Sequence, residues 1–197
     1  MTTAAGKVIV VDDDASVRRS LRRLLTGAGY EVEEFASAEE FLDRANGEEP
    51  ACAVLDLAMP GMDGLALQQE LVSNKFPLGL VFLSGHGDIP ASVAAMKQGA
   101  VDFLTKPVDE NALFPAVERA LADARNQVAL SSRFSSLSPR ELQVMHRVVK
   151  GMLNKQIAAE LGIVEKTVKV HRAHLMEKTG SRSLAELVKL CTKAGIC

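Results

Sequence analysis

The stretch AVLDLAMPGMDG, residues 53–64, runs from an apolar segment into a carboxylate, Asp56, and then into a turn that contains Pro60, Gly61 and Gly64. An unpaired charge buried at the end of a hydrophobic strand destabilises a fold by several kcal/mol. Asp56 is therefore either a solvated loop acid or a reactive acid that other groups hold at the strand end. The residues on both sides of this stretch distinguish the two interpretations.

The first part of the chain alternates short apolar runs with segments of helical period. The apolar runs predict five strands, at residues 7–11, 31–35, 51–56, 78–84 and 101–105. The segments after them predict five helices, at residues 16–28, 38–45, 64–73, 89–98 and about 111–127. Strands that alternate with helices are typical of βαβ units. We therefore expect an α/β fold with a doubly wound, five-stranded parallel sheet covered by helices on both faces.

The pattern changes after Asn126. The segment QVALSSRFSSLS, residues 127–138, carries five Ser in twelve residues, and it predicts a linker over residues 126–136, with continuation of the preceding helix into its start left open. Ser138, Pro139 and Glu141 then have the spacing of a capping box that opens a helix. Four helices are expected from there on, at about 139–150, 153–161, 165–179 and 183–194. The predicted organisation is one domain over residues 1–125, a linker, and a second, all-α four-helix domain over residues 137–197.

The charge of the chain differs between its two parts. Residues 1–125 hold 11 Lys and Arg against 20 Asp and Glu, a net charge of −9, whereas residues 126–197 hold 12 against 5, a net charge of +7. An acidic part joined to a basic part indicates two domains with different partners, and nucleic acid is the candidate for the basic one.

Other sequence signals bear on location and cysteine chemistry. Cys52, Cys191 and Cys197 are odd in number and scattered, and no CxxC spacing occurs, so neither a disulfide framework nor a zinc site is predicted. The start of the chain does not read as a signal peptide, and no apolar stretch approaches the roughly 20 residues that span a bilayer. We therefore expect a cytoplasmic protein without a membrane partner.

Polar residues follow four of the five predicted strands where each strand ends. Asp12 and Asp13 follow the first strand, Asp56 ends the third, Ser84 ends the fourth and Lys106 follows the fifth. In a parallel α/β sheet these carboxyl ends share one edge. Clustered carboxylates raise one another's pKa unless a cation joins them, and Mg²⁺ is a hard ion that such oxygens suit.

The same set of groups fits phosphoryl transfer. A carboxylate such as Asp56 can attack a phosphoryl group and form an acyl phosphate. The metal and Lys106 would neutralise charge on the transferring oxygens, and Ser84 would donate a hydrogen bond to them. Asp56 is then a paired, reactive acid and not an orphaned charge.

Four motifs in this part of the chain carry a family resemblance. The motifs are VVDDD (10–14), LDLAMPGMDG (55–64), FLSGHGD (82–88) and DFLTKP (102–107). With them, residues 1 to about 125 resemble the receiver domain of two-component response regulators. The resemblance implies a flavodoxin-like fold that is phosphorylated on aspartate and binds Mg²⁺.

The resemblance also implies roles for single residues. Asp56 would be the phosphoacceptor, and the protein ligands of Mg²⁺ would be Asp12, Asp13, Asp56 and the backbone carbonyl of Ala58. The groups that respond to the phosphoryl group would be the switch hydroxyl of Ser84, the phosphate-pairing Lys106 and the aromatic ring of Phe103. The peptide bond Lys106–Pro107 is cis in this family, which directs the lysine toward the site.

A phosphatase with an aspartate nucleophile, of the haloacid dehalogenase kind, would use the same chemistry. That family needs a second Asp two residues after the nucleophile as its general acid. Ala58 stands at this position. A phosphatase is therefore the weaker hypothesis, and we expect no enzyme activity beyond the receiver's own phosphorylation and dephosphorylation.

The segment at residues 153–180 has the spacing of a helix-turn-helix. A helix ends at Leu161-Gly162, and a second helix begins near Glu165 after a short turn. The period of the second helix places Val164, Val168, His171 and Leu175 toward the core. The opposite face carries Lys166, Lys169, Val170 and Ala173, whose ammonium and methyl groups suit the DNA major groove.

Residues 135–197 resemble the LuxR-type DNA-binding domain, and the whole chain is similar to FixJ-like members of the NarL/FixJ class. The resemblance places Lys169 and Val170 at positions that reach bases or nearby phosphates, with Thr167 and Lys155 as phosphate contacts. The third groove position, often basic in the class, is Ala173, which leaves the target sequence open.

The two resemblances together imply a two-component response regulator. A cognate sensor histidine kinase would phosphorylate Asp56, and the protein would then bind double-stranded promoter DNA and regulate transcription by RNA polymerase, by analogy as an activator. Phosphorylation would produce a homodimer, free the basic domain, or do both. A constitutive DNA-binding protein with a vestigial receiver is the remaining alternative, although the acidic set is intact.

Overall fold

The computed structural model of the protein describes residues 5–44, 49–85, 89–194 and 196. The chain divides into two compact units, Met1–Asn126 and Gln127–Cys197. Part of the motif at 82–88, the end of the helix predicted at 38–45, and Cys197 lie outside the described residues. Among the residues that the structure describes, no helix combines the length and the apolar character needed to cross a bilayer.

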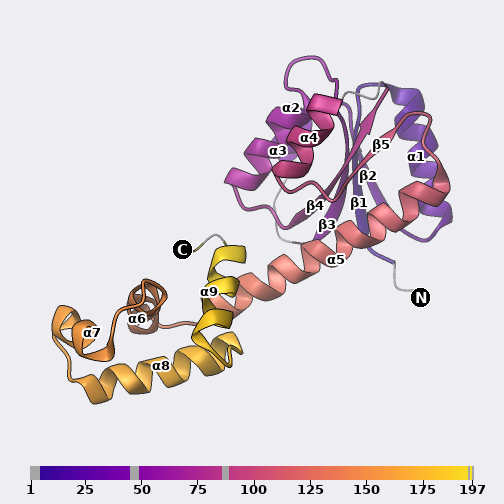
Figure 1. The fold of residues 1–197 in the computed structure, drawn as a ribbon. Helices are drawn as coiled ribbons and strands as arrows, with labels where there is room; N and C mark the ends of the chain where they lie inside the picture. The colour runs from indigo at the N-terminus through magenta and orange to yellow at the C-terminus, as the bar shows by residue number, and fades with distance from the viewer. Residues whose placement is uncertain (1–4, 45–48, 86–88, 195, 197) are drawn as a thin grey trace. The chain divides into compact units, whose positions relative to one another are not determined.

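The first unit is a parallel α/β sheet (Figure 1). Its strands are β1 (Lys7–Val11), β2 (Glu31–Phe35), β3 (Ala51–Asp56), β4 (Leu78–Ser84) and β5 (Asp102–Thr105). They pair in parallel in the order β2-β1-β3-β4-β5, which is the doubly wound, flavodoxin-like order. The helices are α1 (Ala15–Gly27), α2 (Ala38–Arg44), α3 (Gly64–Ser73), α4 (Ile89–Lys97) and α5 (Glu110–Ser135). The predicted fold class is confirmed.

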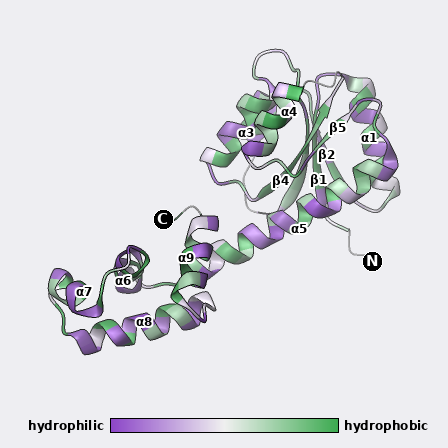
Figure 2. Cartoon of the chain, in the orientation of Figure 1, coloured by the Kyte–Doolittle hydropathy of each residue, from purple (hydrophilic) through white to green (hydrophobic). Residues whose placement is uncertain are grey.

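The sheet has a hydrophobic core on each face. Alternate residues of β1 point to opposite cores, Val8 and Val10 to the side of α1 and α5, Ile9 and Val11 to the side of α2, α3 and α4. Every residue of β3 is buried, because a central parallel strand is covered on both faces. Figure 2 shows the hydrophobic strands between helices that are hydrophilic on part of their surface. Burial on both sides explains why the inner strands β1, β3 and β4 are readable as apolar runs.

The second unit is all-helical. Its helices are α6 (Pro139–Val149), α7 (Asn154–Leu161), α8 (Glu165–Thr179) and α9 (Leu184–Lys193), and the last turns of α5 join them. The capping box at the start of α6 is formed, because Ser138 Oγ accepts from the Glu141 backbone and Glu141 Oε2 accepts from the Ser138 N–H. The expected four-helix domain is therefore present.

The structure corrects two expectations for this unit. Residues 126–135, predicted as a linker, are helical as part of α5. Leu130, Phe134 and Leu137 from this region are buried in the core of the second unit, and the many Ser residues concealed their helical spacing. Val164, expected to face the core, is 68% exposed because it is the extended N-cap residue of α8 and lies outside its helical period.

Candidate functional site

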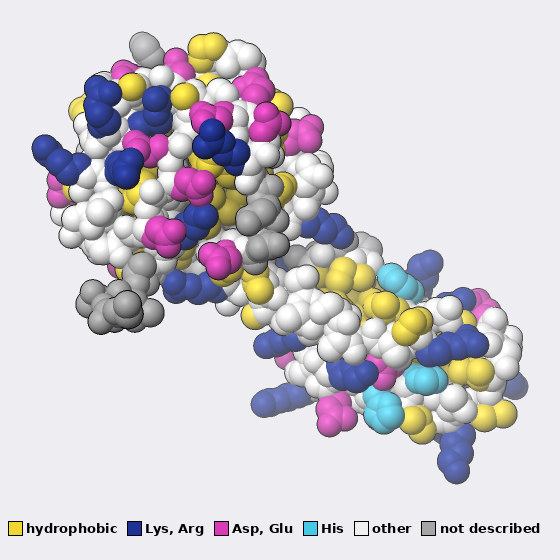
Figure 3. Space-filling model, turned by 180° about the vertical axis from the view of Figure 1, so that it is seen from behind, with side chains coloured by type: hydrophobic (Ala, Val, Ile, Leu, Met, Phe, Trp, Pro, Cys, Tyr) yellow, Lys and Arg dark blue, Asp and Glu magenta, His cyan; other side chains and the backbone are white. Residues whose placement is uncertain are grey.

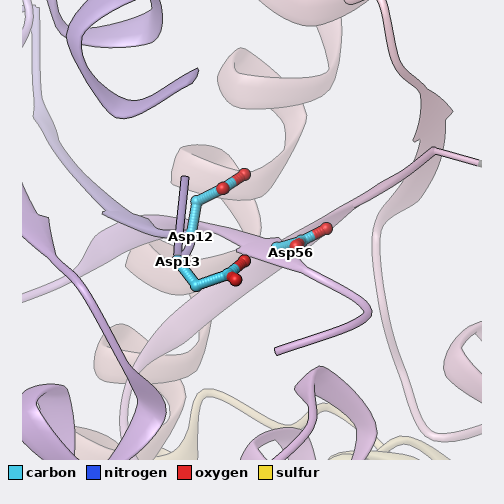
Figure 4. Close-up of side chains that lie close together, drawn as sticks. All are labelled: Asp12, Asp13 and Asp56. Carbon is cyan, nitrogen blue, oxygen red and sulfur yellow. The ribbon is translucent and has the colours of Figure 1, made fainter. Parts of the chain in front are cut away.

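Three carboxylates meet at the carboxyl edge of the sheet. Asp12 and Asp13 follow β1 and Asp56 ends β3, and each offers an oxygen within 4.8 Å of the others. Figure 4 shows the three side chains extending from neighbouring strand ends to the same side. Asp12 and Asp56 are buried, whereas Asp13 is exposed to solvent. The group therefore has two fixed, shielded oxygen donors and one that solvent reaches.

Lys106 supplies the cation that faces these acids. Its ammonium Nζ lies 2.7 Å from Asp12 Oδ2 and 2.9 Å from Asp56 Oδ1. The Lys106 backbone N–H donates to the Ser84 carbonyl at 2.7 Å, which ties the loop after β5 to the end of β4. The Lys106–Pro107 peptide bond is cis, as expected. Asp56, the acid that ends a hydrophobic strand, is thus paired.

Burial and charge set the pKa values of this pair. Burial raises the pKa of Asp56; Lys106 lowers it, and the charges of Asp12 and Asp13 add to the rise. For Lys106, burial alone would lower the pKa, but hydrogen bonds to Asp12 and Asp56 outweigh burial, so that its pKa is raised. The lysine is therefore held as a cation, while the acids around it carry more negative charge than one lysine balances.

The other predicted receiver residues lie near this edge. Ser84 is buried at the end of β4, one strand from Asp56. Phe103, half-buried on β5, stacks on Phe82 with ring centroids 6.3 Å apart. Ala58 lies exposed in the loop two residues after Asp56. Each residue thus occupies the place that the sequence assigned to it, on the strand or loop expected.

The donor set fits a hard divalent cation. Carboxylate oxygens from three residues, one of them open to solvent, match the preference of Mg²⁺ for oxygen ligands and for keeping several waters. The set contains no thiolate or imidazole that would favour a softer metal. Among the described residues, this is the one acidic or metal-ligating cluster of at least three groups.

Three residues outside the predicted site shape the loops around it. Asp14 caps α1, because its Oδ1 accepts from the Ser16 N–H at 2.7 Å. The Ser16 hydroxyl also donates to it, and this bond first, with the N–H second, lowers the pKa of Asp14. Glu39 of α2 accepts from the Met62 N–H in the loop after β3 at 2.9 Å. Arg18 of α1 donates to backbone carbonyls of the loop after β1. The contact of Glu39 joins segments 23 residues apart, and that of Arg18 uses backbone carbonyls, so no side-chain pattern in the sequence predicts either residue.

The second unit contains the expected helix-turn-helix in α7 and α8. Gly162 between them adopts a left-handed conformation, φ +65°, which glycine tolerates. Val168 and Leu175 of α8 are buried as expected. The residues predicted to contact DNA are all exposed except Thr167, which is half-buried. They are Lys155, Lys166, Thr167, Lys169, Val170 and Ala173. Figure 3 shows more Lys and Arg than Asp and Glu on the visible face of this unit.

Polar contacts fix the orientation of α8 within its unit. Glu141 of α6 is 3% exposed and accepts from Lys178 Nζ at 2.7 Å. Arg172 of α8 donates to Asn154 Oδ1 of α7 at 2.9 Å. On the exposed side, Lys169 pairs only loosely with Glu165 at 3.4 Å, so its ammonium remains available to another anion. Contacts with α6 and α7 therefore position α8, while the side chains of its basic face remain exposed to solvent.

Family comparisons agree with this division of the chain. Residues 8–118 match the family described as "Response regulator receiver domain", and residues 135–191 match "Bacterial regulatory proteins, luxR family". The chain is 46% identical to "Nodulation protein W" of Bradyrhizobium diazoefficiens, over 96% of this chain and 86% of that protein. It is 42% identical to "Transcriptional regulatory protein FixJ" of the same organism, over 98% of both chains.

Solved structures of response regulators also match the chain over nearly its whole length. The crystal structure of full-length FixJ from B. japonicum is 42% identical and aligns with a TM-score of 0.60, over 99% of this chain and all (100%) of that chain. The low-resolution structure of the response regulator StyR is 50% identical and aligns with a TM-score of 0.59, over 96% of this chain and 100% of that one.

Proposed function

The chain belongs to the FixJ-like two-component response regulators, with a receiver domain followed by a LuxR-type DNA-binding domain, and from this premise we propose which residues carry its switch. It is a transcriptional regulator and not a metabolic enzyme. Receiver domains generally bind Mg²⁺, and the two domains imply a histidine kinase and DNA as partners. The proposal concerns Asp56, the groups around it and the consequence of its phosphorylation.

Asp56 is the proposed phosphoacceptor. A carboxylate oxygen of Asp56 attacks the phosphorus of a kinase phosphohistidine, the P–N bond breaks, and the imidazole leaves with a proton from solvent. Lys106 is held beside Asp56 at 2.9 Å, ready to neutralise the phosphoryl oxygens. The observation that carries this proposal is the meeting of Asp12, Asp13, Asp56 and Lys106 at one strand edge.

The metal site is proposed at the same edge. The carboxylates of Asp12, Asp13 and Asp56 and the carbonyl of Ala58 would hold Mg²⁺. When bound, Mg²⁺ supplies positive charge that stabilises the phosphoryl oxygens. The protein's own part is to keep Asp12 and Asp56 buried and in contact with one lysine, which fixes the nucleophile before a donor arrives.

Phosphorylation would act through β4, β5 and α4. Ser84 and Lys106 would close on the phosphoryl group, and Phe103, stacked on Phe82, would turn inward from β5. The exposed face of α4 carries Ile89, Val93 and Met96 at helical spacing, and these are 73%, 45% and 45% exposed. An apolar stripe of this kind suits a second copy of the chain, so we propose a homodimer on activation.

The DNA-binding unit would then read two half-sites. Lys166, Lys169, Val170 and Ala173 of α8 would enter the major groove, with Lys155 and Thr167 on phosphates. A dimer would meet half-sites about one helical turn, roughly 34 Å, apart. Bound in the cytoplasm near a promoter, it would regulate RNA polymerase, and by analogy with FixJ-like relatives it would activate transcription.

Selection of DNA from a random duplex pool tests the proposal without a known operator. Purified protein is treated with acetyl phosphate and Mg²⁺, and bound DNA is sequenced beside that bound by Asp56→Asn. We expect paired half-sites to be enriched with wild-type protein and not with the variant. Equal enrichment with Asp56→Asn would show a constitutive DNA-binding protein with a vestigial receiver. The variant Val93→Asp should retain phosphorylation and lose the paired spacing if α4 forms the dimer.

A further inference from the structure

One arginine of α1 turns back on the loop that carries two of the acids. Arg18 Nη1 donates to the backbone carbonyl of Asp12 at 2.6 Å and to that of Asp13 at 3.0 Å. Arg18 is half-buried, whereas its neighbour Arg19 is exposed. The contact joins a cation to the backbone of the residues whose carboxylates form the acidic cluster.

From this contact we infer that Arg18 is a positioning residue for the metal site of the receiver, an inference that rests on the proposed function. By holding two consecutive carbonyls from one guanidinium nitrogen, Arg18 fixes the rotation of the peptide between Asp12 and Asp13. The direction of both carboxylates follows from that rotation. A guanidinium is always charged and donates strong, directional hydrogen bonds, so it suits this task.

The remaining contacts of the loop hold Asp12 and Asp14 more than Asp13. Asp12 Oδ1 accepts from the Asp14 N–H at 2.9 Å, and Asp12 Oδ2 accepts from Lys106 at 2.7 Å. Asp14 is fixed as the cap of α1. Asp13 is exposed, and its backbone carbonyl accepts a hydrogen bond from Arg18, which lies five residues later in α1. The acid that is least shielded is thus the one whose direction depends most on Arg18.

Geometry and charge make opposite predictions for this arginine. As a cation close to a cation site, Arg18 repels a divalent metal, so loss of its charge should strengthen metal binding if charge were its main effect. If Arg18 instead orients the metal ligands, it favours metal binding, and its loss should weaken metal binding. The sign of the change in affinity therefore separates the two roles.

Mn²⁺ binding to the full chain measures that sign without any phosphoryl transfer, because the electron paramagnetic resonance signal of free Mn²⁺ falls as the ion binds. Mn²⁺ shares the preference of Mg²⁺ for oxygen ligands. Arg18→Met keeps the apolar stem and removes both charge and donor, Arg18→Lys keeps a charged donor, and Arg19→Met is the control for charge on the same helix. Thermal unfolding by circular dichroism is recorded for each.

We expect Arg18→Met to bind Mn²⁺ about tenfold more weakly, since removal of a group that orients metal ligands typically costs 10–100-fold. Arg18→Lys should recover most of the affinity, and Arg19→Met should match wild type. Equal or tighter binding by Arg18→Met would overturn the inference. If Arg18→Met unfolds, an affinity of Arg18→Lys no better than that of Asp13→Asn would overturn it. Binding by wild type no tighter than by Asp13→Asn would instead overturn the proposed metal site, and the inference with it.

Discussion

The charge of Glu141 should stabilise the DNA-binding unit, and Glu141→Gln tests this. The carboxylate is 3% exposed, accepts from the Ser138 N–H and from Lys178 Nζ, each at 2.7 Å, and lies 3.7 Å from His174 Nδ1. The hydrogen bond from Lys178 is the largest cause that lowers the pKa of Glu141 from 4.5 to about 2, with the Ser138 N–H second. Ser138 and Lys178 both donate to the same oxygen, Oε2, so a glutamine oxygen at that place can still accept from both, but the neutral amide no longer carries the charge that attracts the Lys178 ammonium.

The pKa shift sets the size of the effect. At about 1.4 kcal/mol per pKa unit, a fall from 4.5 to about 2 corresponds to about 3.5 kcal/mol. The Lys178 side chain is 38% exposed, so solvent screens part of the attraction, and we expect Glu141→Gln to lower the free energy of unfolding by about 2 kcal/mol at pH 7. Because the folded pKa lies below the unfolded one, this stabilisation is complete above about pH 4.5 and is lost as the pH falls toward 2.

The two buried cysteines report on the two units separately. Cys191 lies in the core of the second unit and Cys52 in that of the first, so labelling of each thiol as a function of urea follows the unfolding of its own unit. Glu141→Gln should move the Cys191 transition to lower urea and leave the Cys52 transition in place. Glu177→Gln, an exposed change on α8, is the control and should shift neither by more than about 0.5 kcal/mol.

The pH dependence gives the sharper refutation. The difference in thermal stability between wild type and Glu141→Gln, followed by circular dichroism, should be constant near neutral pH and should shrink between about pH 4.5 and 2. A difference that persists unchanged to pH 2 would show that the loss at neutral pH comes from packing and not from the charge. No difference from Glu177→Gln at pH 7 would refute the reasoning altogether.

Three further changes test other parts of the structure. Phe134→Ala should destabilise the second unit by about 3–5 kcal/mol, because Phe134 is 5% exposed in its core; an unshifted urea transition would place the end of α5 outside that core. Gly64→Ala should cost about 1–3 kcal/mol in thermal unfolding, since the added Cβ would lie 2.4 Å from the Asp56 carbonyl oxygen, and unchanged stability would mean that the loop yields. Lys169→Met should reduce the slope of log DNA affinity against log salt concentration by about 0.9, as measured by fluorescence anisotropy. The exposed Lys193→Met on α9 is the control. Equal slopes for the two variants would show that Lys169 does not contact a DNA phosphate.

Much of the receiver fold was predictable from the sequence. Its inner strands β1, β3 and β4 are buried and appear as apolar runs. The limits of all five predicted strands differ from the structure by at most one residue, at the start of β5. The rule that parallel strands end at one edge placed Asp12, Asp56 and Lys106 together before any distance was known. The ion pairs of 2.7 and 2.9 Å agree with that placement.

The contacts that were not predicted depend on tertiary structure. Glu39 binds a backbone N–H 23 residues away. Arg18 binds carbonyls only five and six residues before it, but a backbone carbonyl has no side-chain signature in the sequence. The end of α5 was misjudged because Ser residues surround Leu130 and Phe134, whose burial requires the helices that follow. Val164 shows the limit of helical period as a guide, since an N-cap residue has extended backbone angles.

The most direct test of the central claim is the intact mass of the protein after incubation with acetyl phosphate and Mg²⁺, with Asp56→Asn and Asp63→Asn measured in parallel. Asp63, the exposed cap of α3, lies in the same loop and controls for the loss of a nearby carboxylate. We expect the gain of one phosphoryl group in wild type and in Asp63→Asn, and none in Asp56→Asn. An equal gain in Asp56→Asn, or no gain in any of the three proteins, would show that Asp56 is not the phosphoacceptor.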